Sequence, residues 1–301
     1  FSYNTTYLTM SSILSLDYVV NEKSTPYISR SEFYPHDIQT YEPKLVKELR
    51  KQNYDFIIFP NYMNSCNLYF KVKCISGQNP FIIDVIYNYA VASFLSKTLL
   101  SGIIEAYKIR DKILKVYKIK NPIHPKETFK LLDHSLNIDF KYWKFNNIFT
   151  FVHHMVPHDA RTSDCKIVDK KFTDYIYKSS VDCAFQQLIN TTKNIISLFP
   201  KAIIIIQGDH GAGHNFNFDV DFNQLSKEEI KSRLGIMNIA RLPNNCKNNF
   251  KDGIGTVNTI KLVLSCISSK EYNFKNESKS FIGFYENNRN FGKVFKVDNL
   301  N

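Results

Sequence analysis

The feature that most constrains the fold is a set of short, unbroken apolar runs separated by segments with helical spacing. The runs are Asp55–Phe59, Asn147–Val152, Ala202–Gln207 and Gly235–Ala240. Continuous apolar runs of this length are typical of parallel strands that are buried on both faces. The sequence therefore predicts a mostly parallel central sheet.

Helical spacing of apolar residues fills the segments between these runs. It occurs at Tyr41–Gln52, Phe172–Leu198 and Thr256–Cys266. Strands that alternate with helices predict an α/β layered domain, with helices flanking the sheet. The last segment, Ser280–Val297, has short apolar runs broken by Asn and Gly, which predict a small C-terminal edge hairpin.

The length allows one large α/β domain or two small ones. The chain has 301 residues, of which 44% are hydrophobic, and this excludes a disordered chain. We expect residues 1–301 to form a single catalytic domain. The most apolar stretch, Val85–Ile104, is interrupted by polar residues and predicts a packed amphipathic helix rather than a membrane span.

The charge balance favours anionic partners. The chain has 39 Lys and Arg against 28 Asp and Glu, a net charge of +11. A basic surface attracts phospholipid head groups or phosphorylated glycans. A compositional bias toward Lys and Asn would give the same number. The lysines are spread along the chain without interleaved aromatics, so no nucleic-acid partner is expected.

The six cysteines form three couples that are local in sequence: Cys66 with Cys74, Cys165 with Cys183, and Cys246 with Cys266. None has the C-x-x-C spacing of a zinc or redox site. Local pairing predicts three disulfides and an oxidising, extracytoplasmic compartment. Six buried thiols in a cytosolic protein are the alternative.

Polar residues follow two of the predicted strands, where α/β sheets bind their ligands. Ala202–Gln207 leads into Gly208-Asp209-His210-Gly211. A carboxylate and an imidazole after a buried strand can both bind a divalent cation, and the two glycines allow a tight turn and a close backbone approach. Asp209 and His210 are therefore candidate metal ligands.

The other polar loop follows Asn147–Val152 and contains three histidines within six residues. His158 lies in a Pro-His turn outside the strand, and we expect it to contact a metal or a transferred phosphoryl group. His154 is closer to the strand and is expected to be half-buried there.

The N-terminal segment predicts a helix that starts near Thr6, with Asn4 or Thr5 as the N-cap. Backbone N–H groups and the helix dipole favour anions at such a position. A divalent cation beside the hydroxyl of Thr5 or Thr6 would lower the pKa of that hydroxyl and make it a nucleophile. The alternative is that these threonines only cap the helix.

Taken in order, four segments resemble the alkaline-phosphatase/sulfatase superfamily, in particular the sulfatase-like, membrane-anchored envelope proteins that include lipoteichoic-acid synthases and phosphoethanolamine transferases. The segments are Tyr3–Tyr18, Phe151–His158, Ile203–Gly211, and Leu234–Asn238 with Val257–Thr259. The resemblance covers nearly the whole chain. It implies an alkaline-phosphatase-like fold, an anionic lipid or glycan substrate, and a membrane surface reached through an N-terminal anchor upstream.

The resemblance also implies roles for single residues. Thr6 becomes nucleophile and metal ligand, and Asp209 and His210 become ligands of Zn²⁺ or Mn²⁺, with Mg²⁺ or Ca²⁺ also compatible. His158 becomes a contact to the transferred group or a ligand of a second metal.

Three further positions are assigned on the same basis. His214 is a candidate acid or substrate contact, because related transferases have a His downstream of Asp-His-Gly. Arg161 and His154 are candidate substrate contacts.

The sequence departs from the family in two ways. Sulfatases need a Cys or Ser in a C/S-x-P-x-R motif, whereas Leu8 and Met10 stand where its Pro and Arg would be. Phosphoryl chemistry is therefore expected rather than sulfate-ester hydrolysis. The family's first acidic ligand would lie upstream of Phe1, and Asp159 is the internal alternative.

The expected activity is metal-dependent transfer or hydrolysis of a phosphoryl group, from a phosphodiester, phospholipid head group or envelope glycan, through a covalent Thr6 intermediate. Two other functions stay open: a catalytically silent binding domain of the same fold, and a nucleic-acid phosphodiesterase. Oligomeric state is not predicted by the sequence.

Overall fold

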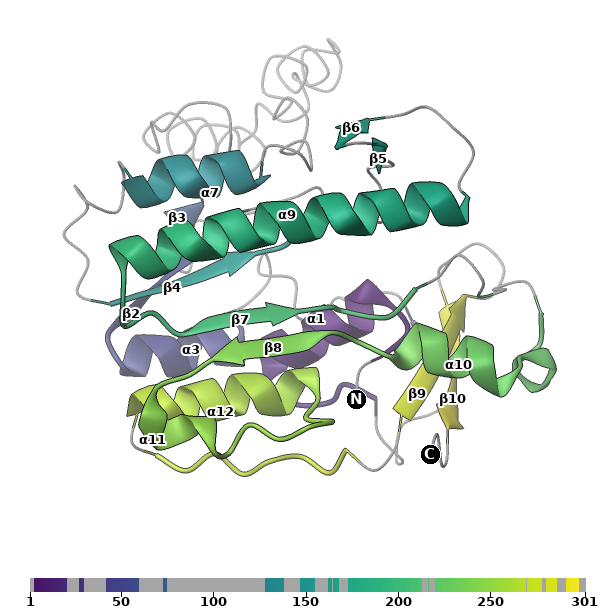
Figure 1. Ribbon diagram of the computed structural model, residues 1–301. Helices are drawn as coiled ribbons and strands as arrows, with labels where there is room; N and C mark the ends of the chain where they lie inside the picture. Colours follow the sequence, from purple (N-terminus) through teal and green to yellow (C-terminus); the bar gives the residue numbers. More distant parts are fainter. Residues whose placement is uncertain are drawn as a thin grey trace, which may run out of the picture. The chain divides into compact units, whose positions relative to one another are not determined.

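The computed structural model in Figure 1 describes residues 3–20, 27–29, 42–59, 73–74, 128–137, 147–154, 162–163, 165–167, 173–212, 216, 220–268, 270–277, 280–285 and 291–297. It mixes helices with strands and includes a small parallel sheet, so the α/β class is as expected. The chain divides into two compact units. Unit 1 comprises residues 1–54, 172–174 and 192–301, and unit 2 comprises residues 55–171 and 175–191.

Unit 1 has a helical core next to a two-stranded sheet. Its elements are α1 (Thr6–Ser15), β1 (Tyr27–Ser29), α3 (Lys44–Lys51), β7 (Ile204–Gln207), η2 (Phe222–Gln224), α10 (Lys227–Leu234), β8 (Asn238–Arg241), α11 (Asn244–Lys247), α12 (Thr256–Ser268), β9 (Ser280–Tyr285) and β10 (Phe291–Val297). Helix α1 packs against α3 and α12. Every residue of α12 from 256 to 264 is buried, as in a helix enclosed on all sides.

The helices of unit 1 lie close to their predicted positions. Helix α3 begins at Lys44 rather than Tyr41, because Pro43 serves as its N-cap and the residue before a proline is disfavoured in a helix. Leu45, Val46 and Leu49 are buried on one face, as their spacing predicts. Helix α12 continues two residues beyond its predicted end at Cys266.

The strand pair β7–β8 corrects the prediction of a mostly parallel sheet. Ile204 pairs with Arg241 and Gln207 with Asn238, so the strands are antiparallel, as their arrows in Figure 1 show. A parallel neighbour would need a crossover that returns the chain to the start of β7. Instead α10 ends beside the end of β7, where the N–H of Gly208 donates to Met237 O (2.9 Å), and the chain enters β8 from that side.

The C-terminal hairpin is present, but it is not an edge of the parallel sheet. Strands β9 and β10 are antiparallel, with Gly292 opposite Tyr285 and Val297 opposite Ser280. Strand β10 also pairs with β1, which gives a separate three-stranded sheet in the order β1-β10-β9. The hairpin is therefore part of a three-stranded sheet, and the sequence pattern did not predict the third strand, β1.

Unit 2 contains the parallel pairing. Its elements are most of β2 (Tyr54–Phe59), β3 (Lys73–Cys74), α7 (Thr128–Asn137), β4 (Asn147–Val152), β5 (Thr162–Ser163), β6 (Lys166–Ile167) and most of α9 (Asp174–Leu198). Strands β3, β2 and β4 form a sheet in that order, with β2 and β3 parallel. The rings of Phe56 and Phe149 stack in its core, with centroids 5.4 Å apart.

Two of the three predicted disulfides are confirmed: Cys165–Cys183 and Cys246–Cys266. Disulfides of this kind persist in oxidising compartments. The third predicted pair involves Cys66, which lies outside the described residues, as does the predicted helix at Val85–Ile104. Within the described part of the chain, no helix combines the length and apolarity needed to cross a bilayer.

Candidate functional site

The start of α1 leaves the Thr6 hydroxyl available for chemistry. Thr5 is the N-cap by backbone conformation (φ −134°, ψ 140°), but its side chain makes no capping hydrogen bond. Helix α1 begins at Thr6, and the first amide bonded within the helix is that of Thr9, which donates to Thr5 O (3.2 Å). The Thr6 hydroxyl thus lies in the first turn, where the helix dipole favours negative charge.

The structure brings this hydroxyl to the loop after β7. Thr6 Oγ1 donates to Asp209 Oδ2 (2.5 Å) and lies 3.2 Å from His210 Nε2. The third distance, from His210 Nε2 to Asp209 Oδ2, is 3.4 Å. The Asp209 and His210 side chains are 22% and 10% exposed, so the cluster is mostly buried but still reached by solvent. Residues about 200 positions apart in the sequence thus meet within unit 1.

The hydrogen bonds of His210 define which ring nitrogen faces the cluster. His210 Nδ1 lies 2.9 Å from Gly211 O, and a carbonyl can only accept, so Nδ1 carries the proton. In the neutral ring, Nε2 then presents a lone pair toward Thr6 Oγ1. The single proton of Thr6 is directed at Asp209. Three electron-rich atoms therefore converge here, and a proton on Nε2 or a cation would be stabilised between them.

The donor set fits a divalent cation. Imidazole nitrogen and carboxylate oxygen bind zinc at about 2.0–2.2 Å, so two ligands of a tetrahedral ion are about 3.3 Å apart. The distances from His210 Nε2 to Thr6 Oγ1 and to Asp209 Oδ2 match this spacing, at 3.2 and 3.4 Å. The distance from Thr6 Oγ1 to Asp209 Oδ2, 2.5 Å, is that of a hydrogen bond and would have to lengthen for both to bind one ion. A backbone carbonyl on the second imidazole nitrogen is the usual support for a metal-binding histidine. Within the described ranges, no group of three or more His, Cys, Asp or Glu side chains is arranged to hold a metal.

Two hydrogen bonds hold the backbone of this loop, one at Asp209 and one at Gly211. The Thr9 hydroxyl donates to Asp209 O (2.7 Å), and Thr9 is fully buried. Gly211 N–H donates to Arg233 O (2.8 Å). A Cβ at Gly211 would lie 1.9 Å from Ser232 O, whereas a Cβ at Gly208 would have no neighbour closer than 3.6 Å. Close packing against the protein thus requires a glycine at Gly211, where the neighbouring atoms belong to Ser232 and Gly235, whereas the predicted approach to a ligand stays a prediction.

Arg233 is a positioning residue that the sequence analysis missed. Its side chain is buried, and it joins the two segments of the site: Nε donates to Asn4 O (2.9 Å) and Nη1 to Gly211 O (3.0 Å). The acceptor on Gly211 is the same carbonyl that receives His210 Nδ1. The sequence does contain a signal that Arg233 is buried. It is a charged residue next to Leu234 and one turn after Ile230, on the apolar face of α10.

Asn238 and Thr259, from the downstream segments that carry the resemblance, connect β8 to α12. Asn238 Nδ2 donates to Thr259 Oγ1 (2.7 Å) and to Ile254 O (3.0 Å). Thr259 is fully buried. This contact holds the strand that pairs with β7 against the central helix of unit 1.

His154 belongs to unit 2 and has a different environment. Its ring lies 4.2 Å from that of Phe129, centroid to centroid. Both ring nitrogens are buried, and among the described residues neither has a hydrogen-bond partner. Burial, and to a lesser extent His153, lowers the pKa of His154 to about 4. The ring is therefore neutral at pH 7, and the half-buried position expected for it is confirmed.

His158, His214, Arg161 and Asp159 lie outside the described residues, so their predicted roles stay predictions. Comparison of the sequence with models of protein families finds no family that matches. Comparison with curated proteins finds no match either.

Proposed function

We propose that the chain is a metal-dependent phosphotransferase or hydrolase of the alkaline-phosphatase/sulfatase type, with Thr6 as its nucleophile. The observation that carries the proposal is the convergence of Thr6 Oγ1 with Asp209 Oδ2 and His210 Nε2, at 2.5 and 3.2 Å. Nucleophilic catalysis needs a hydroxyl, a group that removes its proton, and positive charge at the reacting centre.

The first step is attack by Thr6 Oγ1 on phosphorus. The Thr6 O–P bond forms, the bond from phosphorus to the leaving oxygen breaks, and the Thr6 proton moves along its hydrogen bond to Asp209 Oδ2. His210 keeps its Nε2 lone pair directed at the reaction centre, because Nδ1 is held by Gly211 O. A bound Zn²⁺ or Mn²⁺ would lower the pKa of the hydroxyl and neutralise the developing charge.

In the second step an acceptor oxygen, from water or a glycan hydroxyl, attacks the phosphoryl group on Thr6. The acceptor O–P bond forms, the Thr6 O–P bond breaks, and Thr6 recovers its proton. His158 and His214 are proposed to transfer the protons of the leaving and entering oxygens. The first turn of α1 favours the anion that forms beside it.

The proposal includes the setting of the reaction. Two disulfides support an extracytoplasmic location. The net charge of +11 supports an anionic lipid or glycan substrate at a membrane surface. The alkaline-phosphatase-like arrangement of the sheet is part of the proposal.

The test is to trap the covalent intermediate. The full chain is incubated with bis(p-nitrophenyl) phosphate and Zn²⁺ or Mn²⁺, quenched in acid, and analysed by peptide mass spectrometry. We expect a metal-dependent p-nitrophenylphosphoryl group on Thr6, formed with release of one p-nitrophenol, which is also seen in a Thr5→Ala control because the Thr5 side chain makes no capping bond. Turnover without phosphorylated Thr6 would exclude the covalent step. Lack of both metal binding and turnover would favour a silent binding domain.

A further inference from the structure

A polar cavity of unit 1 lies at the opposite end of α1 from Thr6. It has a volume of about 350 Å³, near the lower end of the range for small-molecule sites. Its lining residues are Leu16, Lys44, Lys261 and the segment Glu271–Lys275. Leu16 follows the last residue of α1, ten residues beyond Thr6, or about 15 Å along a helix. The cavity is therefore separate from the Thr6 cluster.

Three lysines line this cavity against one acidic residue, Glu271. Lys261 is buried and donates one hydrogen bond, to Asn273 O (2.7 Å). Lys275 is paired with Asp17 at 2.8 Å. Lys44 is exposed at the start of α3, and the described residues give it neither a hydrogen bond nor an ion pair.

The surrounding carboxylates already have partners. Glu48 accepts from Lys51 (2.6 Å) and from the Tyr272 hydroxyl (3.1 Å). Glu277 accepts from Gly255 N–H (2.8 Å) and from the Tyr18 hydroxyl. Burial lowers the pKa of Lys261, and Lys275 and Lys44 lower it further, whereas Asp17 and Glu277 act in the opposite direction. Positive charges thus repel one another here, and a bound anion would relieve the repulsion.

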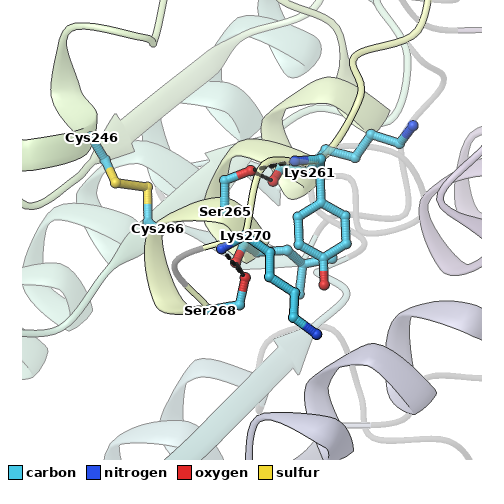
Figure 2. Close-up of a disulfide and its surroundings, with 8 residues drawn as sticks. Cys246, Lys261, Ser265, Cys266, Ser268 and Lys270 are labelled. Atoms are coloured by element: carbon cyan, nitrogen blue, oxygen red, sulfur yellow. Dashed lines mark hydrogen bonds between the residues drawn. A yellow bond between two sulfur atoms is a disulfide. The ribbon is translucent and has the colours of Figure 1, made fainter.

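The wall of the cavity is fixed by side chains of α12. Tyr272 N–H donates to Ser265 Oγ (3.1 Å), and Lys275 N–H donates to Asn258 Oδ1 (2.7 Å). Figure 2 shows Ser265 next to Cys266, whose disulfide with Cys246 ties the end of α12 to α11. The wall is therefore preorganised, which lowers the cost of binding a ligand.

We propose that this cavity binds the phosphate group of a small phosphate ester or of a lipid head group. Lysines act as point charges for an anion with several oxygens, and a phosphate dianion can accept from more than one ammonium group. The rings of Tyr272 and of Phe274, which is 50% exposed, provide apolar surface for the remainder of the molecule. The site is distinct from the proposed catalytic cluster and does not depend on its activity.

The experiment is a calorimetric titration of the full chain with inorganic phosphate and with glycerol 3-phosphate, at low ionic strength. Every titration contains EDTA, so that no divalent cation recruits phosphate to the Thr6 cluster, and the lysine variants assign the binding that remains. A parallel arm measures sedimentation with phosphatidylcholine vesicles, with and without phosphatidic acid. Binding in the soluble arm identifies a free phosphate ester as the source, and binding only to phosphatidic acid vesicles identifies a lipid.

We expect Lys44→Ala and Lys261→Met each to weaken binding by about tenfold, and salt to weaken it further. Lys47→Ala is the matched control, because Lys47 is exposed on the same helix but does not line the cavity. If Lys261→Met does not fold, the exposed Lys44 still tests the site. Absence of phosphate-dependent binding in both arms, unchanged affinity in Lys44→Ala, or an equal loss in Lys47→Ala would overturn the proposal.

Discussion

Two strands end in histidine-containing loops, and the two loops differ in what surrounds the imidazole. After β7, both nitrogens of His210 face polar atoms, Gly211 O and Thr6 Oγ1. After β4, His154 packs on Phe129, and its nitrogens have no hydrogen-bond partner among the described residues. The two strand ends therefore give the imidazole different environments, and the substrate contact predicted for His154 stays a prediction. What distinguishes the β7 loop is a hydroxyl delivered from a distant segment.

The largest effect is expected from removing the Thr6 hydroxyl, the group that distinguishes the β7 loop from the β4 loop. Thr6→Ala removes the hydroxyl that contacts both Asp209 and His210, so kcat for a phosphodiester should fall by at least about 10³-fold. Thr6→Ser should keep part of the activity, because it keeps the hydroxyl. Steady-state kinetics measures both, and circular dichroism checks that the fold is intact. Near-normal turnover of Thr6→Ala would shift the nucleophile to Thr5 or Thr9, or require a non-covalent mechanism.

The next effect concerns the backbone of the same loop. Gly211→Ala would place a methyl group 1.9 Å from Ser232 O and 2.5 Å from Gly235 O, both backbone atoms. We expect a loss of more than about 3 kcal/mol in the free energy of unfolding, from overpacking that the backbone cannot relieve. Gly208→Ala, with no neighbour within 3.6 Å, is the matched control and should change stability by less than about 1 kcal/mol. Urea denaturation compares the two, and equal losses would contradict the close approach at Gly211.

The third effect tests the buried imidazole after β4. In the folded protein the pKa of His154 is about 4, against 6.5 for the unfolded chain, so the unfolded state binds the proton first as pH falls. The stability that His154 contributes is complete above pH 6.5 and is lost between pH 6.5 and 4, by roughly 3 kcal/mol.

His154→Leu should remove this part of the pH dependence, measured by denaturant unfolding at several pH values. His134→Leu, at an exposed position on α7, should leave the parent's profile in place. If stability changed with the same slope between pH 6.5 and 4 in the parent and in His154→Leu, the folded protein would protonate this ring as readily as the unfolded chain does.

Several elements of the fold, though not α7, α10 or β1, were predicted from local sequence, but their pairing could not be. Strand β4 has its predicted bounds, because a buried strand leaves an unbroken apolar run. Strand β8 begins three residues later than predicted, since Gly235–Met237 serve to end α10 and to bind Gly208. Its antiparallel direction depends on where α10 ends in space, and no periodicity encodes that.

The same limit applies to the candidate site. Thr6, Asp209 and His210 could be named because each stands at the end of an element with a recognisable pattern. Arg233 and Thr9 could not, because an apolar face predicts that a residue is buried but not which atoms it contacts. Arg233 finds its acceptors on Asn4 and Gly211, 229 and 22 residues away in sequence.

The smallest expected effect sharpens the comparison by loosening the β7 loop without removing a reacting group. Thr9 lies one turn after Thr6 on α1, is fully buried, and donates to Asp209 O (2.7 Å). Thr9→Val keeps the shape and removes this donor, which should cost about 1 kcal/mol of stability for one neutral hydrogen bond. If the bond also positions the carboxylate, kcat should fall several-fold while KM changes little, because the reacting groups remain. Thr9→Ser, which restores the hydroxyl, should recover both. Unchanged kinetics in Thr9→Val, with the stability loss present, would mean that the Thr9 hydrogen bond is not needed to position Asp209. A loss as large as that of Thr6→Ala would instead make Thr9 a reacting group.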